Sequence, residues 1–87
     1  MKTRFTKIFK SHYSKRIKPN KNLDKRFEER FKLFLENQKN PLLRDHALGG
    51  KMKGFRSFSI TGDIRVIYIF QNNVTYFVDI GSHNQVY

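Results

Sequence analysis

The sequence lacks cysteine and tryptophan, and it is poor in acidic residues and histidine. Without cysteine it can form neither a disulfide nor a thiolate zinc site. Small secreted domains usually carry disulfides, so we expect a protein of the reducing cytoplasm. Seven Asp and Glu and three His among 87 residues are poor material for a metal site, so we expect no metal and no other cofactor.

Long apolar runs and the common nucleotide- and metal-binding motifs are also missing. No segment approaches the roughly 20 apolar residues of a membrane span, and residues 1–7 lack the apolar run of a signal peptide. The chain contains no Walker loop, HExxH motif or EF-hand loop. The length is enough for one domain, which we assign to residues 1–87.

Positive charge is what the sequence has in excess. It carries 18 Lys and Arg against 7 Asp and Glu, which gives a formal net charge of +11. Twelve of the 18 basic residues fall within residues 1–32. A domain this basic repels itself and is expected to meet a polyanion, either nucleic acid or an acidic protein. The alternative is a solvated basic surface that only keeps the protein soluble.

Hydrophobic spacing predicts two helices in the first half of the chain. Apolar residues recur every three or four positions over residues 6–18 and 22–38. Thr6 and Asn22 are suited to cap the two N-termini, and a proline shortly after each segment ends the helix. The expected apolar stripes are Phe5, Ile8, Phe9, Tyr13 and Ile17 in the first helix, and Leu23, Phe27, Phe31, Phe34 and Leu35 in the second.

The hydrophobic period changes from 3.6 to 2 in the second half, which predicts strands. Residues 2–5 can add a short edge strand, residues 40–53 read as a polar loop, and Asn72-Asn73 suits a two-residue hairpin turn. We therefore expect an α+β fold in the order β-α-α-β-β-β, with two helices packed on one face of a mostly antiparallel sheet and the other face free. The candidate strands, rich in Ile, Val, Phe and Tyr, are residues 54–60, 64–71 and 74–81.

Several residues suit RNA cleavage without a metal. There the 2′-hydroxyl attacks the adjacent phosphorus, which requires a base, an acid and a cation that stabilises the phosphorane. His83 follows Gly81 at the sheet rim, and histidine is the side chain best suited to proton transfer in this reaction. The guanidinium of Arg65 can match phosphate oxygens with paired N–H groups. Asp63 shares the face of Arg65, and Tyr87 can stack on an unpaired base. The structural alternatives are a solvated His83, a turn pairing for Asp63 and a Tyr87 ring that pins the tail.

The loop before the sheet holds further candidates. Asp45 can orient the imidazole of His46, although a loop turn with a hydrogen-bonded histidine is the commoner arrangement. Lys51 and Lys53 lie on one side if this segment is extended, where they can contact phosphates. Exposed lysines are common, so a solvated pair is the alternative. Arg56, at the start of an apolar strand, is a further candidate for substrate binding.

The order of the short motifs is more specific than any motif alone. They run as Asp45-His46-Ala47-Leu48, Lys53-Gly54-Phe55-Arg56, Gly62-Asp63-Ile64-Arg65-Val66-Ile67-Tyr68, Gly81-Ser82-His83 and a final aromatic residue, Tyr87. This order resembles the YafQ branch of the RelE-like toxins of bacterial type II toxin–antitoxin systems, most specifically over residues 42–87. Two basic helices before a β-meander also fit the architecture of that family.

The resemblance implies a ribosome-dependent endonuclease that cleaves messenger RNA in the ribosomal A site. His83 matches the family's histidine after the last strand, a proposed general acid or base, and His46 matches the histidine of an Asp-His-x-Leu loop. Asp63 matches the aspartate before the third strand, and Tyr87 the terminal aromatic ring. Arg65 resembles the arginine that stabilises the transition state in RelE-type members. The implied partners are messenger RNA, ribosomal RNA and a cognate acidic antitoxin.

Three positions depart from the family pattern. Ser59 stands where relatives carry a histidine, Ile64 where many carry tryptophan, and Gln85 where they carry an acidic residue. A serine hydroxyl cannot titrate near neutrality. Either Arg65 and His83 carry more of the chemistry, or the protein is slow or has altered specificity. The alternative function is a basic module that binds RNA or the ribosome without cleavage, and Ser59 and Ile64 favour it.

Overall fold

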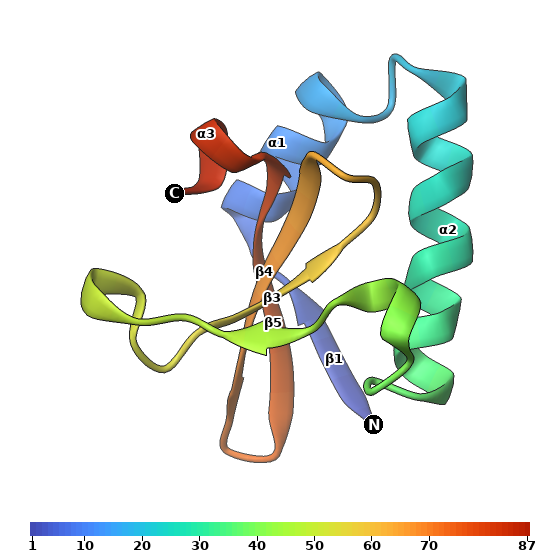
Figure 1. The fold of residues 1–87 in the computed structure, drawn as a ribbon. Coiled ribbons are helices and arrows are strands. Elements are labelled where there is room, and N and C mark those ends of the chain that lie inside the picture. Colours follow the sequence, from blue (N-terminus) through green and yellow to red (C-terminus); the bar gives the residue numbers. More distant parts are fainter.

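The computed structural model describes residues 1–87 and contains a five-stranded sheet with three α-helices (Figure 1). The strand order across the sheet is β1-β5-β4-β3-β2, with β1 parallel to β5 and the other neighbours antiparallel. This confirms the α+β class and the mostly antiparallel sheet. The strands are β1 (Lys2–Phe5), β2 (His46–Ala47), β3 (Arg56–Ser59), β4 (Ile64–Gln71) and β5 (Val74–Ser82), and the helices are α1 (Lys7–Arg16), α2 (Lys21–Glu36) and α3 (His83–Val86).

The two predicted helices form with small shifts at their ends. Thr6 caps α1 as predicted, and its Oγ1 accepts the N–H of Phe9 at 3.1 Å. The prediction of Asn22 as the cap of α2 was wrong. Asn20 has the extended backbone of an N-cap, and its Oδ1 accepts the N–H of Asn22 at 3.0 Å and that of Leu23 at 3.2 Å. No helix has both the length and the apolar character to cross a membrane.

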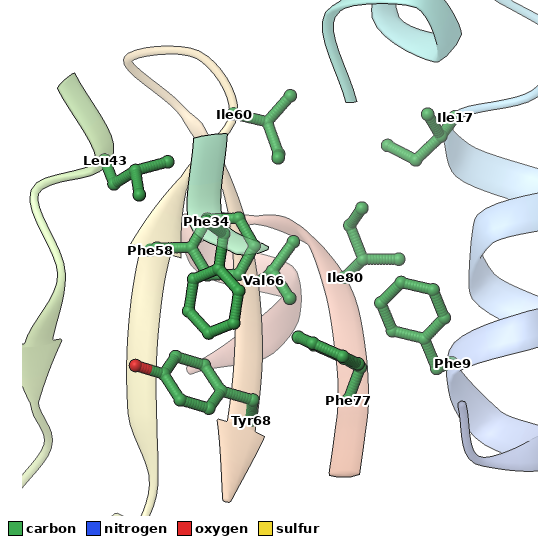
Figure 2. Close-up of a cluster of buried hydrophobic side chains, with 10 residues drawn as sticks. All are labelled: Phe9, Ile17, Phe34, Leu43, Phe58, Ile60, Val66, Tyr68, Phe77 and Ile80. Atoms are coloured by element: carbon green, nitrogen blue, oxygen red, sulfur yellow. The ribbon is translucent and has the colours of Figure 1, made fainter. Parts of the chain in front are cut away.

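Aromatic side chains fill the core between the helices and the sheet (Figure 2). The ring of Phe34 stacks on Phe58 with centroids 4.6 Å apart and meets Tyr68 edge-on at 4.9 Å. Ile8 and Leu35 are exposed and not part of this core, because each is rotated about 100° around its helix from the buried phenylalanine beside it. The core residues are Phe9, Ile17, Phe34, Leu43, Phe58, Ile60, Val66, Tyr68, Phe77 and Ile80.

The β4–β5 hairpin closes through Asn72 and Asn73, whose φ angles of 54° and 64° confirm the predicted turn. The predicted loop of residues 40–53 is more ordered than expected. It contains the turns η1 (Pro41–Leu43) and η2 (Gly50–Met52), and it adds the short strand β2, which pairs with β3.

α1 runs along the edge of β5 where β1 has ended. β1 pairs with β5 only as far as Phe77, and a bulge in the β4–β5 ladder follows. Beyond it, Thr6 Oγ1 donates to the carbonyl of Val78 at 3.3 Å, and Arg16 Nη1 donates to the carbonyl of Ile80 at 3.0 Å. The N-cap residue of α1 and Arg16 therefore satisfy backbone groups that β1 is too short to reach.

The sheet face away from α2 is partly covered, not wholly free as predicted. Ile67 alternates with the core residues of β4 and points to this face, yet it is fully buried. α3 packs on β4 and β5, and its Val86 is buried. Figure 1 shows α3 and the segment of residues 48–54 on the side of the sheet opposite α2. The open surface between them contains the candidate site.

Candidate functional site

Strand pairing sets out two rows of residues on the face away from α2. Directly paired residues project to the same side of a sheet, so each row shares this face. The pairing thereby places the predicted residues His46 and Arg65 on one surface. The first row is His46, Ser57, Ile67 and Asp79, and the second row is Ser59, Arg65 and Gly81.

Arg65 is held in the second row by a cross-strand hydrogen bond. Its Nη1 donates to the hydroxyl of Ser59, its direct partner on β3. Ser59 is only 5 % exposed, whereas the Arg65 side chain is partly exposed. A guanidinium has five N–H donors, so this bond fixes the group and leaves donors for a ligand.

His83 is positioned by its backbone as the first residue of α3. Its N–H donates to the carbonyl of Asp63 at 3.1 Å and lies 3.3 Å from that residue's Oδ1. The exposed imidazole meets the Tyr87 ring edge-on, with centroids 4.6 Å apart. Ser82 and Gln85 close a capping box around the turn, so Gln85 has a structural role. Asp63 and the capping box together fix the backbone position from which the His83 side chain projects.

Arg65 and His83 lie at the same end of the β4–β5 ladder. Arg65 pairs with Gly81, and the His83–Asp63 hydrogen bond continues the ladder two residues further on. Two residues of extended chain span about 7 Å, so the α-carbon of His83 is about that far from Gly81, opposite Arg65. The backbones of Arg65 and His83 are therefore close neighbours at this end of the sheet.

α1 contributes a second arginine that the sequence reasoning missed. Arg16 Nη1 lies 3.5 Å from Asp79 Oδ1. A Cβ added at Gly81 would lie 2.7 Å from the same Nη1, so the guanidinium occupies the space that a side chain at Gly81 would fill. Because Gly81 is the cross-strand partner of Arg65, the two guanidinium groups flank the same point of the sheet.

His12 supplies the signal that could have found this arrangement. It precedes Arg16 by four residues, which puts both side chains on one side of α1. His12 Nδ1 lies 2.6 Å from Asp79 Oδ1, so the two α1 side chains share a carboxylate on β5. The spacing is visible in the sequence, but the carboxylate is 67 residues away from His12 along the chain.

Arg56 belongs to a network at the other face of the sheet. Its Nε and Nη2 donate to Asp45 Oδ1 at 2.8 and 2.6 Å, and the Tyr68 hydroxyl donates to Asp45 Oδ2. Gln38 Nε2 donates to the Tyr68 oxygen at 2.7 Å, and Figure 2 shows this oxygen directed away from the core cluster. Burial, with the carboxylate beside it, raises the pKa of Tyr68, and hydrogen bonding to Asp45 raises the pKa of Arg56.

This network separates residues that the sequence placed together. Asp45 does not orient the imidazole of His46. The Nδ1 atom of His46 instead lies 2.9 Å from the carbonyl oxygen of Arg44, which is the loop-turn alternative. Arg56 alternates with Ser57 and so points away from the face that carries Arg65.

Lys51 and Lys53 are exposed on the segment beside the site face. Their expected alignment required an extended backbone, but Lys51 lies within the η2 turn and the N–H of Lys53 donates to the carbonyl of Gly50 at 3.1 Å. The η2 turn, and not an extended strand, therefore determines where the Lys51 and Lys53 side chains point. No group of three His, Asp or Glu side chains is placed to hold a metal ion.

The solved structures that share this fold are those of bacterial toxins. The chain superposes on YafQ from E. coli strain BL21(DE3) with a TM-score of 0.82 and 18 % identity, over 98 % of this chain and 96 % of that one. A copper-bound mutant toxin from Helicobacter pylori gives 0.82 and 28 %, over 100 % and 99 %. The E. coli DinJ-YafQ complex gives 0.79 and 20 %, over 98 % and 96 %. No curated protein matches the chain.

The family model described as the bacterial toxin of type II toxin–antitoxin system, YafQ, matches residues 1–87. The chain therefore belongs to the YafQ family of type II toxins, which confirms the resemblance read from the motifs.

Proposed function

We propose that this toxin is a ribosome-dependent endoribonuclease that cuts messenger RNA in the A site without a metal. The observation that carries the proposal is the placement of Arg65 and His83 at one end of the β4–β5 ladder. An imidazole and a guanidinium on an exposed face are the groups that attack by a 2′-hydroxyl requires.

In the proposed step, the 2′-oxygen forms a bond to phosphorus and the bond from phosphorus to the 5′-oxygen breaks. One imidazole removes the 2′-hydroxyl proton, and a second group gives a proton to the leaving 5′-oxygen. His83 and His46 are the titratable groups on this face that suit these two transfers. Arg65 and Arg16 stabilise the negative phosphorane oxygens. The products are a 2′,3′-cyclic phosphate and a 5′-hydroxyl.

The remaining predicted residues take supporting roles in this proposal. Asp63 positions the backbone of His83, and Tyr87 orients its imidazole or stacks on a base of the messenger. Lys51 and Lys53 contact phosphates from the segment beside the face. Arg56 acts indirectly, because its ion pair with Asp45 stabilises the loop before β2.

A non-cleaving RNA- or ribosome-binding module is a second candidate, and one observation favours it. The Ser59 hydroxyl is already engaged by Arg65 and is nearly buried, so it supplies no proton at neutral pH. Such a module would arrest translation while messenger RNA stays intact, and its RNA binding would fall steeply with salt.

We also propose an acidic antitoxin as a partner. One similar structure is the E. coli DinJ-YafQ toxin–antitoxin complex, and the net charge of +11 favours an acidic segment that orders on binding. Co-expression with the cognate antitoxin should restore growth, and the two proteins should co-purify. An acidic candidate that does neither is not the partner.

The mechanism is tested by removing the attacking atom. Ribosomes are programmed with a messenger that carries one 2′-deoxynucleotide on the 5′ side of the cut, beside an all-ribose control. We expect cleavage of the control alone, with 2′,3′-cyclic phosphate ends. Equal cleavage of both messengers would show that the 2′-hydroxyl is not the nucleophile.

A further inference from the structure

A basic cleft lies next to the proposed catalytic face. It has a volume of about 280 Å³ and opens between α2, the η1 turn and the turn that joins β3 to β4. Arg26, Arg30 and Arg44 line it, and no carboxylate does. This concentration of unopposed positive charge is suited to an anion.

The charges of the three arginines are largely free. Arg26 and Arg30 are four residues apart and lie on one side of α2. Arg30 and Arg44 make no ion pair, and Arg26 has only Glu29 at 4.0 Å, where both side chains are about half exposed and the pairing is weak. Arg30 Nη1 donates to the carbonyl of Leu42 at 3.3 Å, which fixes one guanidinium at the cleft.

Arg44 occupies an unusual backbone position for an arginine. Its φ of 49° and ψ of 39° are in the left-handed region, where glycine or asparagine is easier to place. Non-glycine residues held in this region are concentrated at functional sites. Arg44 lines the cleft, and its carbonyl oxygen lies 2.9 Å from His46 Nδ1. Arg44 therefore joins the cleft to the catalytic face.

Ser59 is a second residue shared by the cleft and the catalytic face. It lines the cleft, and its hydroxyl is the acceptor for Arg65. The residue that holds Arg65, the arginine proposed to meet the scissile phosphate, therefore also borders the cleft.

We propose that the cleft of Arg26, Arg30 and Arg44 binds a phosphodiester group of RNA that neighbours the scissile phosphate. The inference rests on the proposed function for the identity of the scissile phosphate. Guanidinium groups match phosphate oxygens with paired hydrogen bonds. An amphipathic protein segment fits less well, because the apolar side chains in the lining are limited to Pro41, Leu42 and Ile60, beside three arginines.

The test compares two charge-matched pairs of substitutions on α2, both in a His83→Ala background that does not cut. Arg26→Gln/Arg30→Gln removes two cleft charges, and Lys25→Gln/Lys32→Gln removes two exposed charges outside the cleft. Fluorescence anisotropy with a labelled single-stranded RNA is measured over a salt series. We expect the arginine pair to lose about tenfold or more in affinity with a shallower salt slope, and the lysine pair to lose about twofold.

The variant Arg44→Gly separates an effect on RNA binding from an effect on protein stability. Glycine relieves the left-handed backbone, so this variant should be at least as stable as the parent in thermal unfolding and still bind RNA more weakly. A second arm repeats binding with purified small ribosomal subunits. Weaker binding of the short RNA supports a phosphate of the substrate strand. Weaker binding of the subunit alone would contradict the neighbouring phosphate and assign the cleft to a ribosomal RNA phosphate.

Three outcomes would overturn the phosphate site. The first is an equal loss of RNA affinity in the arginine and lysine pairs. The second is unchanged affinity of the arginine pair for both the short RNA and the ribosomal subunit. The third is weaker antitoxin binding by the arginine pair with RNA affinity unchanged. Binding is measured without cleavage, so a wild-type toxin that fails to cut RNA would refute the nuclease and leave the binding result interpretable.

Discussion

The guanidinium of Arg65 donates a hydrogen bond to the hydroxyl of Ser59 across the β3–β4 ladder. The motif resemblance predicts a histidine at this position, whereas Ser59 supplies a hydroxyl acceptor that holds an arginine. The burial of Ser59 and its bond to Arg65 favour a positioning role over proton transfer.

Ser59→Ala should lower cleavage by about tenfold, mainly in kcat, because Arg65 loses the acceptor that fixes it. Ser59→Thr keeps a hydroxyl and should retain most activity. The matched control is Ser57→Ala, since the buried Ser57 hydroxyl has no hydrogen-bond partner. Its removal should leave activity unchanged and leave stability equal or higher. Equal activity losses for the two alanine variants would contradict a specific role for Ser59.

Gly81→Ala should damage both the fold and the site. The new Cβ would lie 2.7 Å from Arg16 Nη1 and 2.7 Å from Gln85 Oε1, so both side chains must move. We expect a loss of about 1–2 kcal/mol in denaturant unfolding, from the displaced hydrogen bonds, and reduced cleavage. At Gly62, where a Cβ meets nothing within 4 Å, alanine should change stability by less than about 0.5 kcal/mol. Indistinguishable unfolding curves for the two variants would refute the close packing over Gly81.

Tyr68 should make stability fall at alkaline pH. Burial and the Asp45 carboxylate raise its pKa in the folded state, so its contribution is complete below the ordinary tyrosine pKa of about 10 and is lost as pH rises further. The difference in unfolding free energy between wild type and Tyr68→Phe should therefore shrink above about pH 10. Urea titrations of both proteins at several pH values measure it. A difference that stays constant with pH would show that the phenol is not perturbed.

Tyr87 should affect the chemistry through the imidazole of His83, because the two rings meet edge-on. Tyr87→Phe retains the ring and should keep activity, whereas Tyr87→Leu should lower kcat several-fold and alter the pH–rate profile. A loss confined to KM in Tyr87→Leu would instead indicate that the ring only binds the messenger.

Local patterns in the sequence were enough to predict most of the fold. The spacing of large apolar residues located both helices, and Asn72-Asn73 located the hairpin, because these signals act between near neighbours. One of the errors was also local. Asn20 and Asn22 are equally good cap residues, and only the path of the chain from α1 decides between them.

The site was harder to predict because its contacts join distant segments. Asp45 looked like a partner for the adjacent His46, yet it pairs with Arg56 on β3. Arg16 gave no motif of its own, since its role depends on Asp79 from the far end of the chain. Such contacts appear only once the strand register is known.

The most direct test is primer extension on a reporter messenger after brief induction in cells, with wild type beside His83→Ala. We expect breaks at fixed codon positions with the wild type, lost both in the variant and when the start codon is removed. Growth arrest with intact messenger, or the same breaks with His83→Ala, would contradict a ribosome-dependent nuclease that uses His83.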